Sequence, residues 1–214
     1  MLRIEQFICN PFQENTYLIY NEQKECFVID PGCYNTQEQA DLLNYIQSNQ
    51  LQVMAIVNTH CHIDHVFGVN YLVENLAVPF KIHPAELPVL LAAPEVGQRF
   101  GVHCPPITST PEYITQADKL KLGNYTFEIR FTPGHSPGSI SFYQAESKWL
   151  ISGDVLFQGS IGRTDLPGGS FETLEQSIRN ELYTLPDDTT VFSGHGPTTT
   201  IGQEKRTNPF VKAH

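Results

Sequence analysis

The chain has 214 residues, enough for one domain with a substantial core, and its hydrophobic fraction of 40% is ordinary for a globular protein. Its formal net charge of −10 leaves no basic surface to neutralise phosphates, which argues against nucleic-acid binding, and no apolar stretch is long enough to span a bilayer. The first residues lack the pattern of a secretory signal, and the five cysteines lack framework spacing, so we expect reduced thiols in a cytoplasmic protein.

The first part of the chain predicts a hairpin, a helix and a strand. Residues 15–20 and 26–30 have the composition of two strands joined by a turn. Residues 36–49 carry apolar side chains on a helical period, and the apolar run 53–57 predicts the next strand.

A dense group of metal-binding residue types follows that strand. The run His60-Cys61-His62-Ile63-Asp64-His65 places three imidazoles and one carboxylate within six residues. Zinc-type ions bind imidazole nitrogen and carboxylate oxygen, so the run predicts a metal site. We expect Cys61, which stands between two candidate ligands, to be a buried packing residue.

The middle of the chain predicts a helix and a long loop. Residues 64–76 have an apolar face on a helical period, and Asp64 suits the N-terminal end of a helix. Residues 92–112 are rich in Pro and Gly with little periodicity, which predicts a loop that forms a wall of the substrate pocket.

The second half repeats the order of the first. Residues 139–143 and 149–152 predict a hairpin, residues 171–185 a helix, and the strand after it ends at His195. Hairpin, helix, strand and His thus occur twice. The repeat predicts two similar halves, sheet on sheet with helices outside, and chance similarity between small α/β units is the alternative.

Four further residues of ligand type stand where an apolar run stops at a Gly or Pro. They are Asp30, His135, Asp154 and His195. Loops at strand ends carry the functional groups of layered α/β proteins, so we expect these residues to converge on one point. Asp30 either orients a ligand His as a neighbouring carboxylate or is a plain turn residue. Arg163 and Asp165 are predicted to form an ion pair in the loop after Asp154.

The motif His60-x-His62-x-Asp64-His65-x-x-Gly68, with the three downstream residues, resembles the metallo-β-lactamase-fold hydrolase superfamily over essentially the whole chain. The segment 157–169 is similar to the short glyoxalase II-like (hydroxyacylglutathione hydrolase-like) branch. The resemblance implies an α/β fold, the αββα four-layer sandwich, with two similar halves and the metal site at the strand ends. We expect a single domain over residues 1–214, without the C-terminal helical domain that binds glutathione in full-length glyoxalase II.

The resemblance also implies a metal for each candidate ligand. One ion would be held by His60, His62 and His135, the second by Asp64, His65 and His195, and Asp154 would bridge them. We expect two divalent ions, zinc in the first place, with iron or manganese as alternatives. Two such ions lower the pKa of a shared water and polarise a carbonyl. Asp64 would be catalytic, orienting the nucleophile or accepting its proton.

We therefore predict a binuclear metallohydrolase of the glyoxalase II type, which hydrolyses a 2-hydroxyacyl thioester such as S-lactoylglutathione through a metal-bound hydroxide. A persulfide dioxygenase is the main alternative, because that relative uses a single iron held by two His and one Asp, which here would be His60, His135 and Asp154. A non-catalytic metal-binding scaffold is a minor alternative. Antibiotic hydrolysis is disfavoured because the best-known β-lactamases carry Cys at the position of Asp154. We expect a small-molecule thioester as the partner, neither nucleic acid nor membrane, and a monomer or small homo-oligomer.

Overall fold

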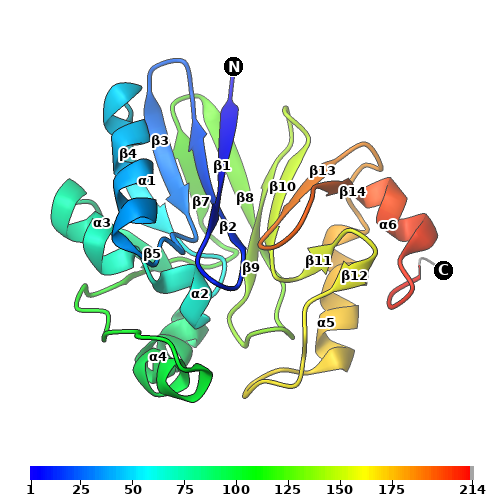
Figure 1. The fold of residues 1–214 in the computed structure, drawn as a ribbon. Helices are drawn as coiled ribbons and strands as arrows, with labels where there is room; N and C mark the ends of the chain where they lie inside the picture. The colour runs from blue at the N-terminus through cyan, green and yellow to red at the C-terminus, as the bar shows by residue number, and fades with distance from the viewer. Residues whose placement is uncertain (213–214) are drawn as a thin grey trace. The chain divides into compact units, whose positions relative to one another are not determined.

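The computed structural model describes residues 1–212, which form two compact units. The N-terminal unit comprises Met1–Ile114 and Lys121–Tyr125, and the C-terminal unit comprises Thr115–Leu120 and the chain from Thr126 onward. Each unit is built on a six-stranded mixed sheet. Figure 1 labels most of the strands and helices along the chain. Within residues 1–212, every helix is too short or too polar to cross a membrane.

The sheet of the N-terminal unit has its strands in the order of the sequence. The first three strands run antiparallel and each later strand runs parallel to the one before it. Every residue of the second strand is buried, including the polar residues Glu14, Asn15 and Thr16 at its start. The strands are β1 (Arg3–Cys9), β2 (Glu14–Tyr20), β3 (Glu25–Ile29), β4 (Gln52–Val57), β5 (Phe80–Ile82) and β6 (Glu112–Tyr113).

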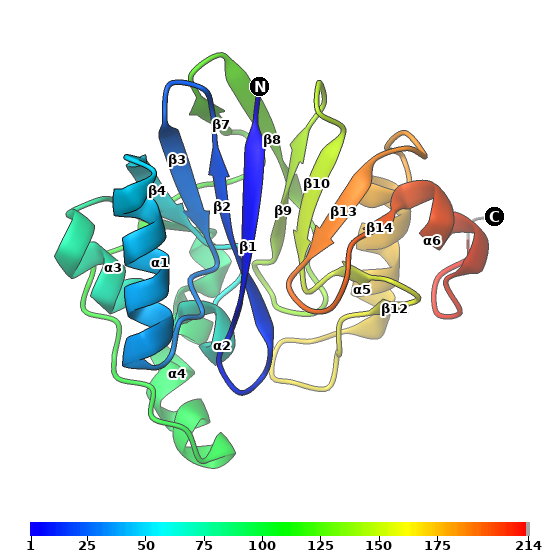
Figure 2. The ribbon, with the colours of Figure 1, turned by 45° about the horizontal axis from the view of Figure 1, so that its top comes forward.

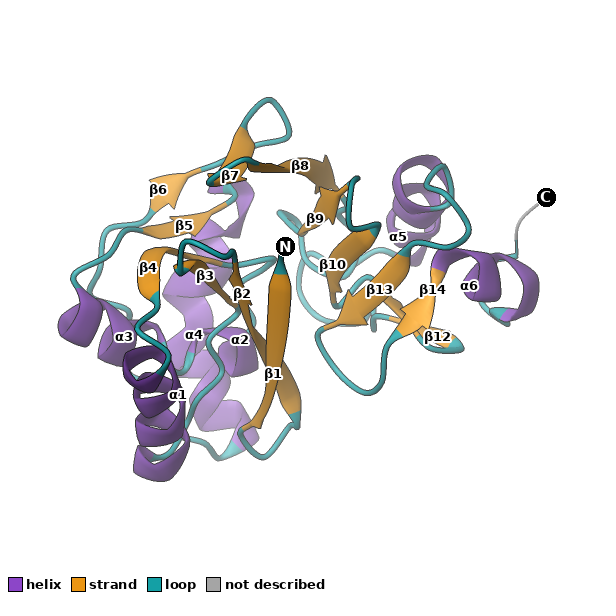
Figure 3. Cartoon of the chain, turned by 90° about the horizontal axis from the view of Figure 1, so that it is seen from above, coloured by secondary structure: helices purple, strands orange, loops and turns teal. Residues whose placement is uncertain are grey.

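The helices of this unit lie on one face of its sheet (Figure 3). Leu42 and Ile46 of the first helix and Leu72 of a later one are buried in one cluster with the strand residues Val28 and Ile56. Burial of these apolar faces stabilises the layer. The helices are α1 (Thr36–Ser48), α2 (Ile63–Val66), α3 (Val69–Leu76), the short η1 (Pro84–Glu86) and α4 (Leu87–Phe100).

The sheet of the C-terminal unit has the order β14-β13-β10-β9-β8-β7. A separate two-stranded hairpin, β11–β12, follows β10 along the chain. Figure 2 shows α5 behind the sheet and α6 just beyond β14. The strands are β7 (Lys119–Leu122), β8 (Tyr125–Phe131), β9 (Ile140–Gln144), β10 (Trp149–Gly153), β11 (Leu156–Phe157), β12 (Ser160–Ile161), β13 (Thr190–Ser193) and β14 (Thr199–Thr200). The helices are α5 (Phe171–Ser177), the π-helical turn η2 (Ile178–Leu182) and α6 (Ile201–Thr207).

The predicted internal repeat is confirmed by the strand pairing. The hairpin β2–β3, the helix α1 and the strand β4, parallel to β3, form one copy. The hairpin β9–β10, the helix α5 and the strand β13, parallel to β10, form the other. Because parallel neighbours end at the same edge of a sheet, each copy brings two strand ends together, and loops at such ends are where functional groups gather.

The helix predicted over residues 64–76 is wrong in one respect, because it is interrupted between α2 and α3. At the interruption, the Gly68 backbone N–H donates to the carbonyl of Pro31 at 2.8 Å. A Cβ at Gly68 would lie 2.2 Å from the Sγ of Cys33, so glycine is needed for this close approach of two loops. The predicted helix over residues 171–185 likewise changes its winding, from α5 to the π-helical turn.

The loop predicted over residues 92–112 is wrong in its first part, since α4 continues to Phe100. Pro94 lies inside the helix, where it removes one backbone donor. The buried face of Leu90, Ala93 and Gly97 outweighs that loss, and Gly101 ends the helix with a positive φ of 70°. The spacing of 90, 93 and 97 is the sequence signal that the Pro content concealed.

Candidate metal centre

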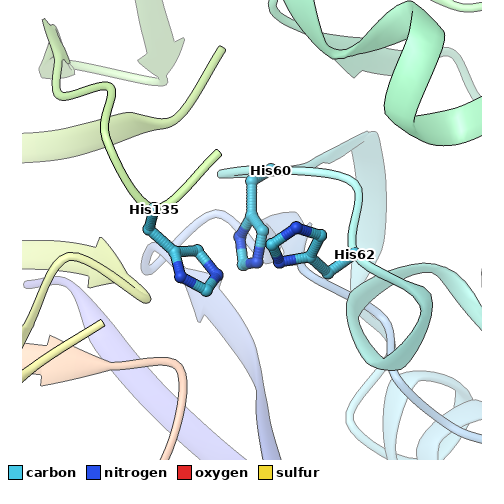
Figure 4. A group of neighbouring side chains, drawn as sticks. All are labelled: His60, His62 and His135. Carbon is cyan, nitrogen blue, oxygen red and sulfur yellow. The ribbon is translucent and has the colours of Figure 1, made fainter. Parts of the chain in front are cut away.

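The four candidate ligands of the N-terminal unit share one short loop after β4. Asn58 closes this loop, because its Nδ2 donates to the carbonyls of His60 at 3.2 Å and His65 at 2.7 Å. The ring of His60 lies 4.8 Å from that of His62, nearly perpendicular to it, and 4.1 Å from that of His65. Figure 4 shows His60 and His62 projecting side by side from the loop. The fold therefore holds these imidazoles together within one unit.

Asp30, at the end of β3, lies directly behind this loop. Its Oδ1 accepts the backbone N–H of Thr59 at 2.6 Å, and its Oδ2 accepts the hydroxyl of Thr59 at 2.6 Å. The same Oδ2 lies 3.2 Å from Nδ1 of His65. Asp30, His60 and His65 are all buried, with their donor atoms within 4.8 Å of one another. Of the two roles open from the sequence, the structure favours a carboxylate that orients a ligand His.

A second buried carboxylate stands near His65, and sequence reasoning missed it. Glu14, at the start of β2, is fully buried, and its Oε1 lies 3.9 Å from Nδ1 of His65. Its Oε2 accepts the hydroxyl of Thr16 at 2.8 Å. Burial raises the pKa of Glu14 well above its ordinary value. Glu14 is a strand residue far from the motif along the chain, and its sequence context gives no signal of this position.

The remaining residues of the loop differ in exposure. The Oδ2 of Asp64 lies 3.7 Å from Nε2 of His65, and Asp64 is partly exposed. Cys61 is fully buried with a free thiol, which confirms the prediction of a packing residue. Its backbone N–H donates to Oε2 of Glu86 at 2.7 Å, so a buried carboxylate in η1 also holds the loop.

The C-terminal unit carries three candidate ligands on three strand ends. His135 follows β8, Asp154 follows β10 and His195 follows β13. The Oδ2 of Asp154 lies 3.6 Å from Nε2 of His135 and 3.4 Å from Nε2 of His195. Two atoms bound to one tetrahedral ion at about 2.0–2.1 Å lie about 3.3 Å apart. One carboxylate oxygen thus stands at ligand spacing from two imidazole nitrogens.

The loop after Asp154 fixes the ring of His135, which Figure 4 shows on its turn after β8. Nδ1 of His135 lies 2.8 Å from the backbone carbonyl of Arg163, an acceptor that requires the proton on Nδ1 and leaves Nε2 free to bind a metal. A Cβ at Gly162 would lie 1.9 Å from the carbonyl oxygen of Asp154, so the loop packs tightly here.

The predicted ion pair in this loop is confirmed. The guanidinium of Arg163 donates to both carboxylate oxygens of Asp165 at 2.7 and 2.8 Å. These hydrogen bonds lower the pKa of Asp165 to about 2. Both side chains are largely exposed, so the pair shapes the loop and adds little stability.

The donor atoms in both units fit a metal of the zinc type. Each unit supplies imidazole nitrogens and at least one carboxylate oxygen. The Arg163 carbonyl pairs with Nδ1 of His135, and a carboxylate oxygen of Asp30 lies 3.2 Å from Nδ1 of His65. Four of the predicted ligands lie in the N-terminal unit and three in the C-terminal unit. The N-terminal set is His60, His62, Asp64 and His65, and the C-terminal set is His135, Asp154 and His195.

Comparison with known proteins identifies the family. The family model described as the Metallo-beta-lactamase superfamily matches residues 9–195, so the chain belongs to this superfamily and has its fold. The predicted recognition and fold class are confirmed.

Three similar proteins cover nearly the whole chain. One is the hydroxyacylglutathione hydrolase GloC of Haemophilus influenzae, which is 40% identical over 216 residues, 99% of each chain. The solved structure of the BLEG-1 B3 metallo-beta-lactamase is 40% identical, with a TM-score of 0.87 and coverage of 98% of this chain and 99% of that one. The structure of TTHA1623 in a di-iron-bound form is 39% identical, with a TM-score of 0.88 and coverage of 97% and 100%.

Proposed function

We propose that this protein is a binuclear metallohydrolase that cleaves a 2-hydroxyacyl thioester. One observation carries the proposal: the Oδ2 of Asp154 stands 3.4 and 3.6 Å from the Nε2 atoms of His195 and His135. A carboxylate oxygen at ligand spacing from two imidazoles suits a bridging ligand. The 40% identity to a hydroxyacylglutathione hydrolase over the full length supports the choice of reaction.

The family resemblance assigns the ligands. His60, His62 and His135 would hold one ion, Asp64, His65 and His195 the other, and Asp154 both. Two divalent ions in such a site lower the pKa of a bound water and polarise the carbonyl under attack. Zinc suits the donor atoms, and the di-iron form of TTHA1623 makes iron the metal to test beside it.

The residues of the chain would prepare this chemistry in distinct ways. Asp64 is partly exposed, so its carboxylate is accessible to orient the attacking water and accept its proton. Asp30 would keep Nδ1 of His65 protonated and Nε2 directed at the metal. The leaving group is a thiolate, and the pKa of a thiol is about 8.5, so the thiolate can leave without being protonated by a dedicated acid.

The acyl part of the substrate is proposed here, whereas the thiol to which it is joined is left to experiment. Lys205 and Arg206 would be the natural cations for the carboxylates of glutathione, but Nζ of Lys205 already donates to Asp187 at 2.7 Å and to the carbonyl of Leu185 at 3.1 Å. This lysine is engaged within the fold. We therefore propose the 2-hydroxyacyl group as the recognised part and test several thiol carriers.

A second candidate, β-lactam hydrolysis, comes from the relative described as a B3 metallo-beta-lactamase, which matches this chain at 40% identity and a TM-score of 0.87. The same residues would hold the ions, which would activate a water against an amide carbonyl in place of a thioester. A thiolate is a much better leaving group than an amine, so cleavage of the thioester depends less on protonation of the leaving group.

The test begins with the metal content of untagged protein by elemental analysis, followed by initial rates with zinc-loaded and iron-loaded protein. The panel holds S-lactoylglutathione, the lactoyl thioesters of coenzyme A and cysteine, a chromogenic β-lactam, and a glutathione persulfide with oxygen uptake as the readout. Two metals per chain with saturable thioester hydrolysis would support the proposal. One iron with persulfide-dependent oxygen uptake would replace it with the dioxygenase, and preferred β-lactam turnover would replace it with the second candidate.

A further inference from the structure

The short hairpin β11–β12 is connected to every candidate ligand of the C-terminal unit. It begins two residues after Asp154 and ends two residues before Arg163, whose carbonyl engages His135. The ring of Phe157 within it lies 6.3 Å from the ring of His195. A shift of this hairpin would therefore displace Asp154 and the Arg163 carbonyl that pairs with His135, and would change the ring contact with His195.

The hairpin cannot hold this position by its own pairing. Its strands have two residues each, with Leu156 paired to Ile161 and Phe157 to Ser160. A two-stranded ribbon of this length is not stable in isolation. Its base is fixed from the sheet, because the carbonyl of Leu156 accepts the hydroxyls of Ser152 at 3.0 Å and Ser193 at 2.8 Å. Its turn needs a separate support.

That support is a buried carboxylate in α6. Glu204 is fully buried, and its Oε2 accepts the backbone N–H of Gly159, in the turn, at 2.9 Å. The same oxygen accepts Nδ2 of Asn208 at 2.9 Å, and Oε1 accepts the hydroxyl of Thr199 at 2.6 Å. Asn208 also donates to the carbonyl of Ser160 at 3.0 Å. Three donors thus converge on one carboxylate, a group that only accepts.

The helix that carries Glu204 is itself anchored. Ile201 and Val211 are fully buried in the same apolar cluster as Val155 and Leu156. The hydroxyl of Tyr183 donates to the carbonyl of Val211 at 2.9 Å, which ties down the segment after the helix. Glu204 therefore connects a fixed element to the turn of a weakly paired one.

We propose that Glu204 is a positioning residue that, with Asn208, holds the β11–β12 turn in place. It thereby positions Asp154 for metal binding, and also the Arg163 carbonyl that orients His135. The inference rests on the proposed function, since it concerns the ligands of that site. The carboxylate acts through Gly159 and touches neither ligand nor substrate.

The test compares Glu204→Ala, Glu204→Gln and Tyr183→Phe with the wild type. Ala removes the acceptor of the Gly159 N–H, of the Thr199 hydroxyl and of one Nδ2 hydrogen of Asn208, which still donates to the Ser160 carbonyl. Gln can still accept from Gly159 with its oxygen and donate to Thr199, whose hydroxyl can rotate. Tyr183→Phe removes a hydrogen bond of the C-terminal segment without touching the turn, so it controls for a merely destabilised unit.

Two readouts are independent of turnover. The first is amide hydrogen exchange of a peptide covering Gly159, and the second is zinc affinity by chelator competition. For Glu204→Ala we expect exchange at least about tenfold faster and zinc affinity about tenfold lower, the usual effect of removing a residue that supports a ligand. With a thioester that the wild type cleaves, kcat should fall while KM changes less than about twofold. Glu204→Gln should stay within about threefold of the wild type in all three.

The proposal is overturned if Glu204→Ala loses thermal stability but keeps the wild-type zinc affinity and exchange, or if Tyr183→Phe changes zinc affinity equally. Another outcome would refute the proposed function without by itself deciding the role of Glu204. A wild type that binds zinc and cleaves no thioester would refute the reaction, and exchange and zinc affinity would still decide the role of Glu204. A wild type that binds no zinc would refute both.

Discussion

Replacing Asp30 separates the orientation of a ligand from the stability of its loop. Asp30 accepts two hydrogen bonds from Thr59 and faces Nδ1 of His65 at 3.2 Å. Its φ is 49°, in the left-handed region that Asn adopts more readily than Ala does. Asp30→Asn can keep both bonds with Thr59, because its oxygen accepts the N–H and its NH2 group donates to the hydroxyl oxygen. That NH2 group then faces Nδ1 of His65 in place of a carboxylate oxygen.

The expected energies follow from these contacts. A hydrogen bond to a charged group contributes about 1.5–3 kcal/mol and a neutral one about 0.5–1.5 kcal/mol. Asp30→Asn should therefore lower the free energy of unfolding by about 1–3 kcal/mol. Asp30→Ala loses both bonds and adds backbone strain of about 1–2 kcal/mol, for a loss of about 4–8 kcal/mol. Zinc affinity of the Asn variant should fall about 10–100-fold.

Urea unfolding of the metal-free protein measures the first quantity, and competition with a chromophoric chelator measures the second. Chelator competition at 15 °C, well below the unfolding transition of the Asn variant, keeps the two effects apart. A zinc affinity of Asp30→Asn equal to that of the wild type would refute the role of Asp30 in orienting His65. A stability loss as large as that of Asp30→Ala would refute the assignment of its bonds to Thr59.

His62→Ala should abolish hydrolysis and reduce bound metal, while Cys61→Ala should keep turnover within about twofold, because its buried thiol packs away from the site; full activity of the His62 variant would refute the ligand assignment. Gly68→Ala should cost about 1–3 kcal/mol of unfolding free energy, since its Cβ would meet the Sγ of Cys33 at 2.2 Å, and adding Cys33→Ala should recover part of it in a double-mutant cycle. Burial lowers the pKa of His83, so the unfolded chain takes up a proton before the folded one does. Its contribution is fully present above the unfolded pKa of about 6.5 and is lost as pH falls, so wild-type Tm should drop more between pH 7.5 and 5.5 than Tm of His83→Asn; equal slopes would contradict this.

The strand ends could be predicted from the sequence because their signals are local. An apolar run that stops at Gly or Pro with a His or Asp at its tip marks Asp30, His135, Asp154 and His195, and the structure places each of them after a strand. The internal repeat could be predicted for the same reason, because each hairpin, helix and strand has its own hydrophobic periodicity.

The carboxylates that hold the loops could not be predicted, because their partners are distant in sequence. Glu86 binds the N–H of Cys61 and Glu204 binds the N–H of Gly159, each across more than twenty residues of chain. Nothing in the composition around a buried Glu distinguishes it from one on the surface. Only the pairing of the elements decides which backbone donors need an acceptor.

The repeat places an Asp at the same structural position in both units, but the two carboxylates face different imidazole nitrogens. Asp30 directly follows β3 and Asp154 directly follows β10. The parallel partner of β3 leads to His60, His62 and His65, and the parallel partner of β10 leads to His195. Asp154 faces the Nε2 atoms of its histidines at 3.4 and 3.6 Å, whereas Asp30 faces the Nδ1 atom of His65 at 3.2 Å. A carboxylate beside Nε2 can share a metal ion with that nitrogen. A carboxylate beside Nδ1 holds the proton there and leaves Nε2 available to the metal. The same strand end therefore carries a carboxylate that faces Nε2 in one unit and Nδ1 in the other, the positions expected of a metal ligand and of the support of a ligand.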